Sequence, residues 1–148
     1  MPSTHTSLHY HFVFSTKGRD RSIDPKWRDD LHRYMGGIVR GLGGAGLSVG
    51  GVDDHVHVLA GLKPTHCVSD VLRDLKKSSS VWVHDHVGIR HFAWQEGYGG
   101  FTVSRSKVDE VRAYIERQEE HHRHLSFQEE YLELLKSHQL EYDERFVW

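Results

Sequence analysis

The sequence predicts an α+β protein with a ferredoxin-like sandwich, in which helices pack on an antiparallel sheet. Segments with alternating apolar residues and segments with apolar residues at helical spacing follow one another in the order β-α-β-β-α-β-α-α. No internal repeat or low-complexity linker divides the chain. We therefore expect one domain over residues 1–148, with a core at 5–124 and a C-terminal helical tail at 125–148.

The N-terminal half supplies three of the predicted strands and one helix. Residues 7–16 alternate in polarity and predict the first strand. An Asp-Pro pair typical of a helix start opens residues 24–42, which carry an apolar stripe and end at glycines. Residues 47–52 and 55–62 then form two β-type runs around Asp-Asp, so they predict an antiparallel hairpin.

The C-terminal half predicts three helices and the last strand. A helix over residues 69–82 is followed by an aromatic, β-branched run at 91–104, whose central glycines indicate a strand with a bulge or bend. A helix capped by Ser106 follows to residue 118. A capping box of the form Ser-x-x-Glu opens the final helix at 127–137.

Charge is distributed unevenly along the chain. The net charge is −2, yet residues 1–118 hold 16 Lys/Arg against 13 Asp/Glu, whereas residues 119–148 hold 3 against 8. This balance permits contact with nucleic acid through a local patch rather than through a general field. A single cysteine, the lack of a secretory leader and the lack of a long apolar run predict a cytoplasmic protein without a membrane segment.

His55 and His57 form the first element that suggests chemistry. Side chains in a strand repeat every two residues, so both imidazoles point to the same face with Cα atoms roughly 6.5 Å apart. That spacing allows both to bind one metal ion, and Asp54 is a further candidate as ligand or as hydrogen-bond partner. An isolated His-x-His more often marks a half-exposed strand, which is the alternative interpretation.

Tyr114 and Gln118 form the second such element. On a helix these two side chains lie only ~40° apart, so a phenol and an amide oxygen share one side. A tyrosine at the edge of the core is the simpler explanation when this pair is taken alone. Together with the histidines, however, the pair supplies a nucleophile and a cation site, which transfer of a phosphoryl group to tyrosine requires. Such a site suits magnesium or manganese, and zinc is also possible.

The chain resembles the single-tyrosine transposases of the HUH superfamily, in the insertion sequence 200/605 group, and their repeat-associated relatives. The resemblance spans nearly the whole chain and rests on the order of its motifs. These are the first strand at residues 10–17, Asp54-His55-Val56-His57, the helix at 69–80, the Trp94-Gln95-x-Gly97-Tyr98-Gly99 run, and Tyr114-Ile115-x-x-Gln118 before His121-His122.

The resemblance implies an activity and a site. Such enzymes cleave single-stranded DNA at hairpin-bearing ends, form a 5′-phosphotyrosine link, release a 3′-hydroxyl and rejoin strands. Carried over by position, Tyr114 is the nucleophile, and His55, His57 and Gln118 bind a divalent Mg²⁺ or Mn²⁺ ion. The resemblance also implies a homodimer, here joined through the sheet, in which the tyrosine helix of one subunit can complete the metal site of the other.

Two helix segments carry candidate contacts to DNA phosphates. Lys76 and Lys77 lie in a basic, hydroxyl-rich helix, and Arg105 and Lys107 precede the tyrosine helix. A solvated helix face explains the first pair equally well. Two other functions remain open at this stage: a domesticated relative that binds hairpins in repeated genomic DNA without mobilising an element, and a histidine-rich metal-binding protein without a DNA partner.

Overall fold

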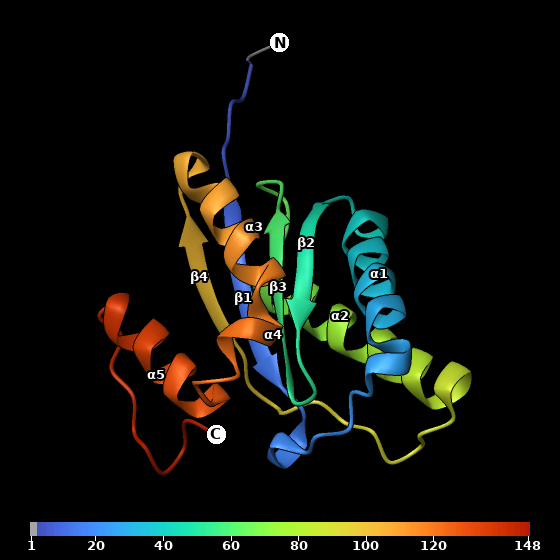
Figure 1. Ribbon diagram of the computed structural model, residues 1–148. Coiled ribbons are helices and arrows are strands. Elements are labelled where there is room, and N and C mark those ends of the chain that lie inside the picture. The colour runs from blue at the N-terminus through green and yellow to red at the C-terminus, as the bar shows by residue number, and fades with distance from the viewer. Residues whose placement is uncertain (1–2) are drawn as a thin grey trace.

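The computed structural model describes residues 3–148 and contains one four-stranded antiparallel sheet with helices packed on it, which confirms the α+β class. The strands run in the order β2-β3-β1-β4, so the first and third strands in the chain lie at the centre (Figure 1). β2 and β4 are the two edges. The strands are β1 (His9–Ser15), β2 (Ala45–Gly51), β3 (His55–Gly61) and β4 (Gly99–Val103).

Helices cover both faces of this sheet. α1 and α2 pack on one face, and α3 crosses the other, with α4 and α5 near its lower end in the view of Figure 1. Short turns η1 (Lys17–Arg19), η2 (Val83–Val87) and η3 (Arg105–Lys107) join these elements. The helices are α1 (Pro25–Gly41), α2 (Val68–Trp82), α3 (Val108–Glu116), α4 (Gln118–His121) and α5 (Phe127–Ser137).

The face beneath α1 and α2 is the apolar core. Phe12 pairs with Val58 and Phe14 with Val56 across β1 and β3, and all four side chains are fully buried. Helix residues of α1 and α2 fill the space above them, because each helix carries its apolar residues on one stripe. This layer holds the central strands rigid from behind.

The opposite face carries the polar side chains of the same strands. Because successive side chains alternate, His55 and His57 point away from the core that Val56 and Val58 enter. The register pairs His57 with Val13 and His55 with Ser15. α3 and α5 cover this face and leave both imidazoles without exposed surface.

Two predicted elements differ from the structure. The strand expected over 91–104 is reduced to Gly99–Val103, and the segment before it is a loop that includes one β-bridge, between Thr16 and Trp94. Trp94 is buried and donates from its indole to Ser79, so this aromatic residue fills the core instead of continuing the sheet.

The tyrosine helix also differs from the prediction, because it is not continuous to residue 118. α3 ends at Glu116, Arg117 leaves helical geometry, and Gln118 begins the short α4. Ser106 lies in η3 and does not cap α3, and Cys67 rather than Ser69 stands at the N-cap of α2. The remaining helix starts are confirmed: the Asp24 carboxylate accepts from Lys26, and Ser126 with Glu129 forms a complete capping box.

Within residues 3–148, the structure contains no helix of the length and apolar character that a membrane span requires.

Candidate metal and nucleophile site

β3 positions the two histidines, and α3 brings the tyrosine over them. The approach of α3 to the sheet depends on Gly50 in β2, since a Cβ there would lie 2.5 Å from the carbonyl oxygen of Ile115. Ile115 is buried against Leu59 and Val103, which holds the helix in place. Tyr114, the residue before it, therefore reaches the histidine face of the sheet.

Glu130 of α5 is the centre of the site and is 1% exposed. Its Oε1 lies 3.0 Å from Nε2 of His57, 3.0 Å from Nε2 of His122 and 3.3 Å from Nε2 of His55. Its other oxygen, Oε2, accepts hydrogen bonds from the hydroxyl of Tyr114 and from the side-chain amide of Gln118. One carboxylate thus contacts Tyr114, Gln118 and both strand histidines.

A second layer of contacts fixes the imidazole rings. Nδ1 of His55 lies 2.7 Å from the Asp54 carboxylate, and its Nε2 lies 3.1 Å from Oε1 of Gln118. Nδ1 of His57 lies 2.7 Å from Nε2 of His11 on the neighbouring strand. Partners of this kind orient a metal-binding imidazole and select the nitrogen that it offers to an ion.

The pKa values of the three strand histidines diverge. Burial lowers the pKa of His57 to about 4 and that of His11 to about 3, in the latter case with help from the charge of His57. Burial also opposes the charged form of His55, but hydrogen bonds to Asp54 and Glu130 outweigh it and raise its pKa to about 9. At neutral pH His55 therefore carries a positive charge, and His11 and His57 are neutral.

The pKa values of the Glu130 carboxyl and the Tyr114 phenol shift in opposite directions. Burial disfavours the Glu130 carboxylate, but hydrogen bonds from His122, His55 and His57 prevail and hold its pKa well below the usual range. Burial and the adjacent Glu130 charge raise the pKa of Tyr114 well above its usual value. The phenol is thus protonated and directed at a carboxylate, which is a resting state rather than an activated nucleophile.

The donor set fits a divalent metal ion. Nitrogen atoms of His55, His57 and His122 and a carboxylate oxygen of Glu130 all lie within 4.8 Å of one another. Imidazole nitrogens with one carboxylate oxygen suit manganese or zinc better than magnesium, which prefers oxygen ligands. Gln118 adds an amide oxygen beside His55.

The structure brings the predicted site residues together but leaves the predicted DNA contacts outside. Tyr114, His55, His57 and Gln118 all meet around Glu130 within a single chain. Lys76 and Lys77 lie on α2, which packs on the face opposite to the imidazoles. The ammonium group of Lys76 donates to the backbone carbonyls of residues 95–97, and burial lowers its pKa to about 8.

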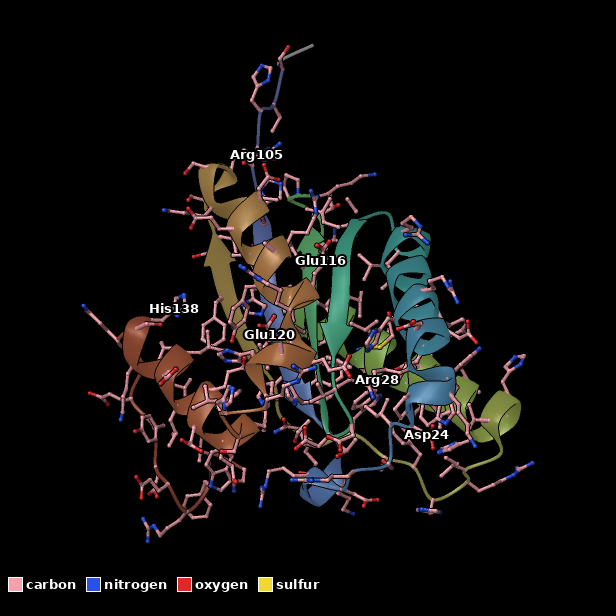
Figure 2. All side chains as sticks on the ribbon, viewed as in Figure 1. Asp24, Arg28, Arg105, Glu116, Glu120 and His138 are labelled. Carbon is pink, nitrogen blue, oxygen red and sulfur yellow. The ribbon has the colours of Figure 1, made fainter. Side chains whose placement is uncertain are left out.

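Arg105 and Lys107 are exposed in η3, at the start of α3, whereas Tyr114 lies in its last turns. Figure 2 shows Arg105 at the end of this helix remote from Glu116 and Glu120. Arg105 is therefore remote from the phenol, whereas Lys107 lines one pocket together with Tyr114 and His11.

Three residues of the site were not predicted as members: Glu130, His122 and His11. Glu130 occupies an apolar stripe of α5 together with Phe127, Tyr131 and Leu135, and an acid in such a stripe is a signal of a buried partner. His11 carried a weaker signal, because the alternation of the first strand already placed it on the polar face.

A family described as "Transposase IS200 like" matches residues 4–118, which include the two histidines, Tyr114 and Gln118. The chain belongs to the IS200-like transposase family. Membership makes it a DNA-cleaving and strand-transferring enzyme by class. The match ends before α5, so Glu130 lies outside the part of the chain that defines the family. No curated protein matches this transposase.

Two solved structures share the fold of this transposase. A protein from Deinococcus radiodurans R1 that has been assigned as a transposase is 26% identical, with a TM-score of 0.64 over 80% of this chain and 95% of that one. A REP-associated tyrosine transposase, solved bound to a REP hairpin, is 14% identical, with a TM-score of 0.59 over 82% of this chain and 74% of that one.

Proposed function

We propose that this transposase cleaves and rejoins single-stranded DNA through Tyr114, with a divalent metal ion held by the adjoining histidine cluster. The observation that carries the proposal is the convergence of the phenol, both strand histidines and Gln118 on the single carboxylate of Glu130. A nucleophile and a set of metal ligands within one hydrogen-bonded cluster are the parts that phosphoryl transfer to tyrosine needs.

The proposed reaction exchanges one phosphodiester for another. The phenolic oxygen of Tyr114 attacks the phosphorus, a P–O bond to tyrosine forms, and the bond from phosphorus to the 3′-oxygen breaks. The proton lost by the phenol balances the proton gained by the 3′-hydroxyl that leaves. Glu130 accepts a hydrogen bond from the phenol and so orients its oxygen. Rejoining is the reverse attack by a 3′-hydroxyl on the 5′-phosphotyrosine.

His55, His57, Gln118 and Glu130 are the residues that would hold the metal ion, with His122 as a further ligand. When bound, the ion supplies Lewis-acid stabilisation of charge on the phosphate oxygens. Asp54 and His11 orient the imidazoles through the nitrogens that face away from Glu130. We propose manganese or zinc ahead of magnesium, because the cluster is rich in nitrogen donors.

Likeness to a transposase solved with a REP hairpin supports hairpin-bearing DNA as the substrate. We further propose cytoplasmic action as a homodimer, in which a sheet edge, β2 or β4, offers the pairing surface. Tyr114 meets His55 and His57 within the same chain here, so dimerisation is not needed to complete this arrangement of the site. Lys76, Lys77, Arg105 and Lys107 stay candidates for contacts with DNA beyond the cleavage point.

The test is a search for the covalent adduct. The full chain is incubated with single-stranded hairpin DNA and Mn²⁺, the products are separated under denaturing conditions, and the modified peptide is mapped by mass spectrometry. We expect an adduct on Tyr114 that requires the metal and is absent in Tyr114→Phe. The Tyr142→Phe variant, altered at a tyrosine outside the cluster, is the matched control and should form the adduct normally.

An adduct that persists in Tyr114→Phe would refute the assignment of the nucleophile. Hairpin binding without any adduct, in the presence of bound Mn²⁺, would favour the domesticated DNA-binding relative. Metal binding that survives the loss of Gln118, without affinity for hairpin DNA, would favour a metal-binding protein.

A further inference from the structure

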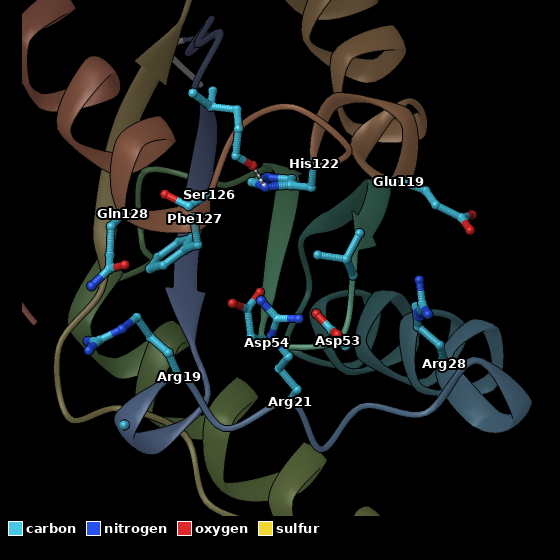
Figure 3. A pocket seen from close by; sticks show the side chains of 13 residues that line it. Arg19, Arg21, Arg28, Asp53, Asp54, Glu119, His122, Ser126, Phe127 and Gln128 are labelled. Atoms are coloured by element: carbon cyan, nitrogen blue, oxygen red, sulfur yellow. Dashed lines mark hydrogen bonds between the residues drawn. The ribbon is translucent and has the colours of Figure 1, made fainter.

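A cavity of about 480 Å³ adjoins the metal cluster on its solvent side. Its wall comes from η1, the loop after it, α1, the turn between β2 and β3, and the segment from α4 into the first turn of α5 (Figure 3). Asp54 and His122 belong both to this wall and to the cluster. The cavity has the size of pockets that hold small ligands, about 300–1,000 Å³.

Three guanidinium groups line this cavity, those of Arg19, Arg21 and Arg28. Within residues 3–148, none of them forms an ion pair with an acidic side chain, and Nε of Arg28 is buried without a hydrogen-bond partner. The donors of this arginine cluster are thus available to an anion.

Three acidic side chains, those of Asp53, Asp54 and Glu119, share the wall with this arginine cluster. Asp54 is already bonded to Nδ1 of His55 in the neighbouring cluster. Of the other two acids in the wall, Asp53 and Glu119, the latter is exposed to solvent. The N-terminus of α5 also faces the cavity and adds the positive end of a helix dipole.

We propose that this cavity binds a backbone phosphate of the DNA strand, next to the phosphate that Tyr114 attacks, and that Arg19, Arg21 and Arg28 hold it. The assignment rests on the proposed function, because it places the cavity on the path of the strand into the metal cluster. Arginine suits this role, since its planar fork donates two parallel hydrogen bonds to phosphate oxygens. Contacts to phosphates fix the register of a strand without reading its bases.

The first test compares two triple variants of equal charge. One carries Arg19→Gln, Arg21→Gln and Arg28→Gln. The control carries Arg33→Gln, Arg73→Gln and Arg112→Gln, residues that are each paired with an aspartate elsewhere on the surface. Binding of a labelled single-stranded oligothymidine is measured by fluorescence anisotropy, with EDTA present to prevent cleavage, over a range of salt concentrations.

We expect the cavity variant to lose at least about tenfold in affinity near physiological salt, and its salt dependence to flatten by about 0.7 in log–log slope for each phosphate contact removed. The control variant should lose less in affinity and keep its slope. Equal losses in both variants would overturn the assignment, because they would reflect net charge alone. Circular dichroism shows whether both variants fold.

A second measurement uses the unaltered chain, so its result does not depend on whether the triple variants fold. An oligonucleotide with a photoreactive bromouracil is crosslinked by ultraviolet light, and the attached peptides are mapped. Crosslinks within residues 18–28 or 125–128 support the cavity, whereas crosslinks confined to α2 overturn it. An adduct on Tyr114 together with an unaffected cavity variant would reject the cavity and leave the proposed function standing. Absence of both oligothymidine binding and adduct would reject the two together.

Discussion

The two faces of the sheet use the same two central strands for opposite purposes. Phe12, Phe14, Val56 and Val58 face α1 and α2 in an apolar layer in which nearly every contact is between hydrocarbon groups. One residue along each strand, His11 and His57 face α3 and α5, where they are buried just as deeply but only as members of a hydrogen-bonded cluster. Side chains are buried on both faces, but only the imidazoles lose contact with water that their hydrogen bonds must replace.

The two faces of the sheet therefore have different roles. Apolar burial depends little on pH or on metal ions, whereas a buried polar cluster depends on each partner and on protonation. The apolar face therefore anchors the strands, and the polar face is the part of the molecule that responds to metal ions and to pH.

The largest effect should follow from damage to the apolar face. Phe14→Ala empties a fully buried position in edge contact with Trp94, so we expect it to lower the free energy of unfolding by about 3–5 kcal/mol. Chemical denaturation measures this loss. Thr102→Ala, at an exposed position of the same sheet, should change stability by less than about 0.5 kcal/mol. A comparable loss from both would contradict the assignment of the core.

Acid should destabilise the polar face. The pKa of His57 is about 4 in the folded chain and 6.5 as an ordinary value, so the unfolded chain takes up the proton first as the pH falls. Stability is therefore lost between about pH 6.5 and 4, by about 3 kcal/mol for a shift of this size. Denaturation midpoints across this range measure it. His11→Gln removes a second group of the same kind and should flatten the slope.

Metal binding should depend on the polar face of the sheet. His57→Ala removes a ligand, so we expect Mn²⁺ or Zn²⁺ affinity to fall by at least about 100-fold, about 2.8 kcal/mol. Isothermal titration calorimetry measures this change, and metal should no longer raise the melting temperature. His9→Ala, on β1 outside the cluster, is the control and should bind as the unaltered chain does. Retained affinity in His57→Ala would remove the histidine from the site.

The smallest effect concerns the helix that carries Glu130. Ser126→Ala removes the cap and the reciprocal bond with Glu129, which should cost about 1 kcal/mol of stability. Ser137→Ala, at the other end of α5, should cost less than about 0.5 kcal/mol because that serine is exposed. Thermal melts compare the two, and equal effects would show that the cap does not stabilise α5.

Local patterns in the sequence predicted much of the fold and half of the site. Alternation placed His55 and His57 on one face because strand geometry depends only on neighbours. The strand expected at 91–104 is formed only in part: Trp94 makes a single bridge with Thr16, and its indole donates to Ser79, a tertiary contact that no local pattern reports. Gln118 kept its predicted position near Tyr114 although the helix breaks between them, since both contact Glu130.

Glu130 and His122 could not be placed from spacing in the sequence. Glu130 is 73 residues beyond His57 and joins the cluster only through the packing of α5 on Val13 and Phe101. The acidic character of residues 119–148 was taken as a property of the tail as a whole, yet one of its carboxylates is fully engaged inside the molecule. A buried partner for an acid is found only when the third dimension is known.

The position of Glu130 in α5 also affects when the site can assemble during synthesis on the ribosome. A ribosome releases the strands and the tyrosine well before α5, so the growing chain carries a phenol and imidazoles that lack their shared carboxylate. The complete set of donors exists only after α5 has emerged. The cluster of Tyr114, the histidines and Glu130 therefore assembles only after the sheet and the helices that surround it have been synthesised.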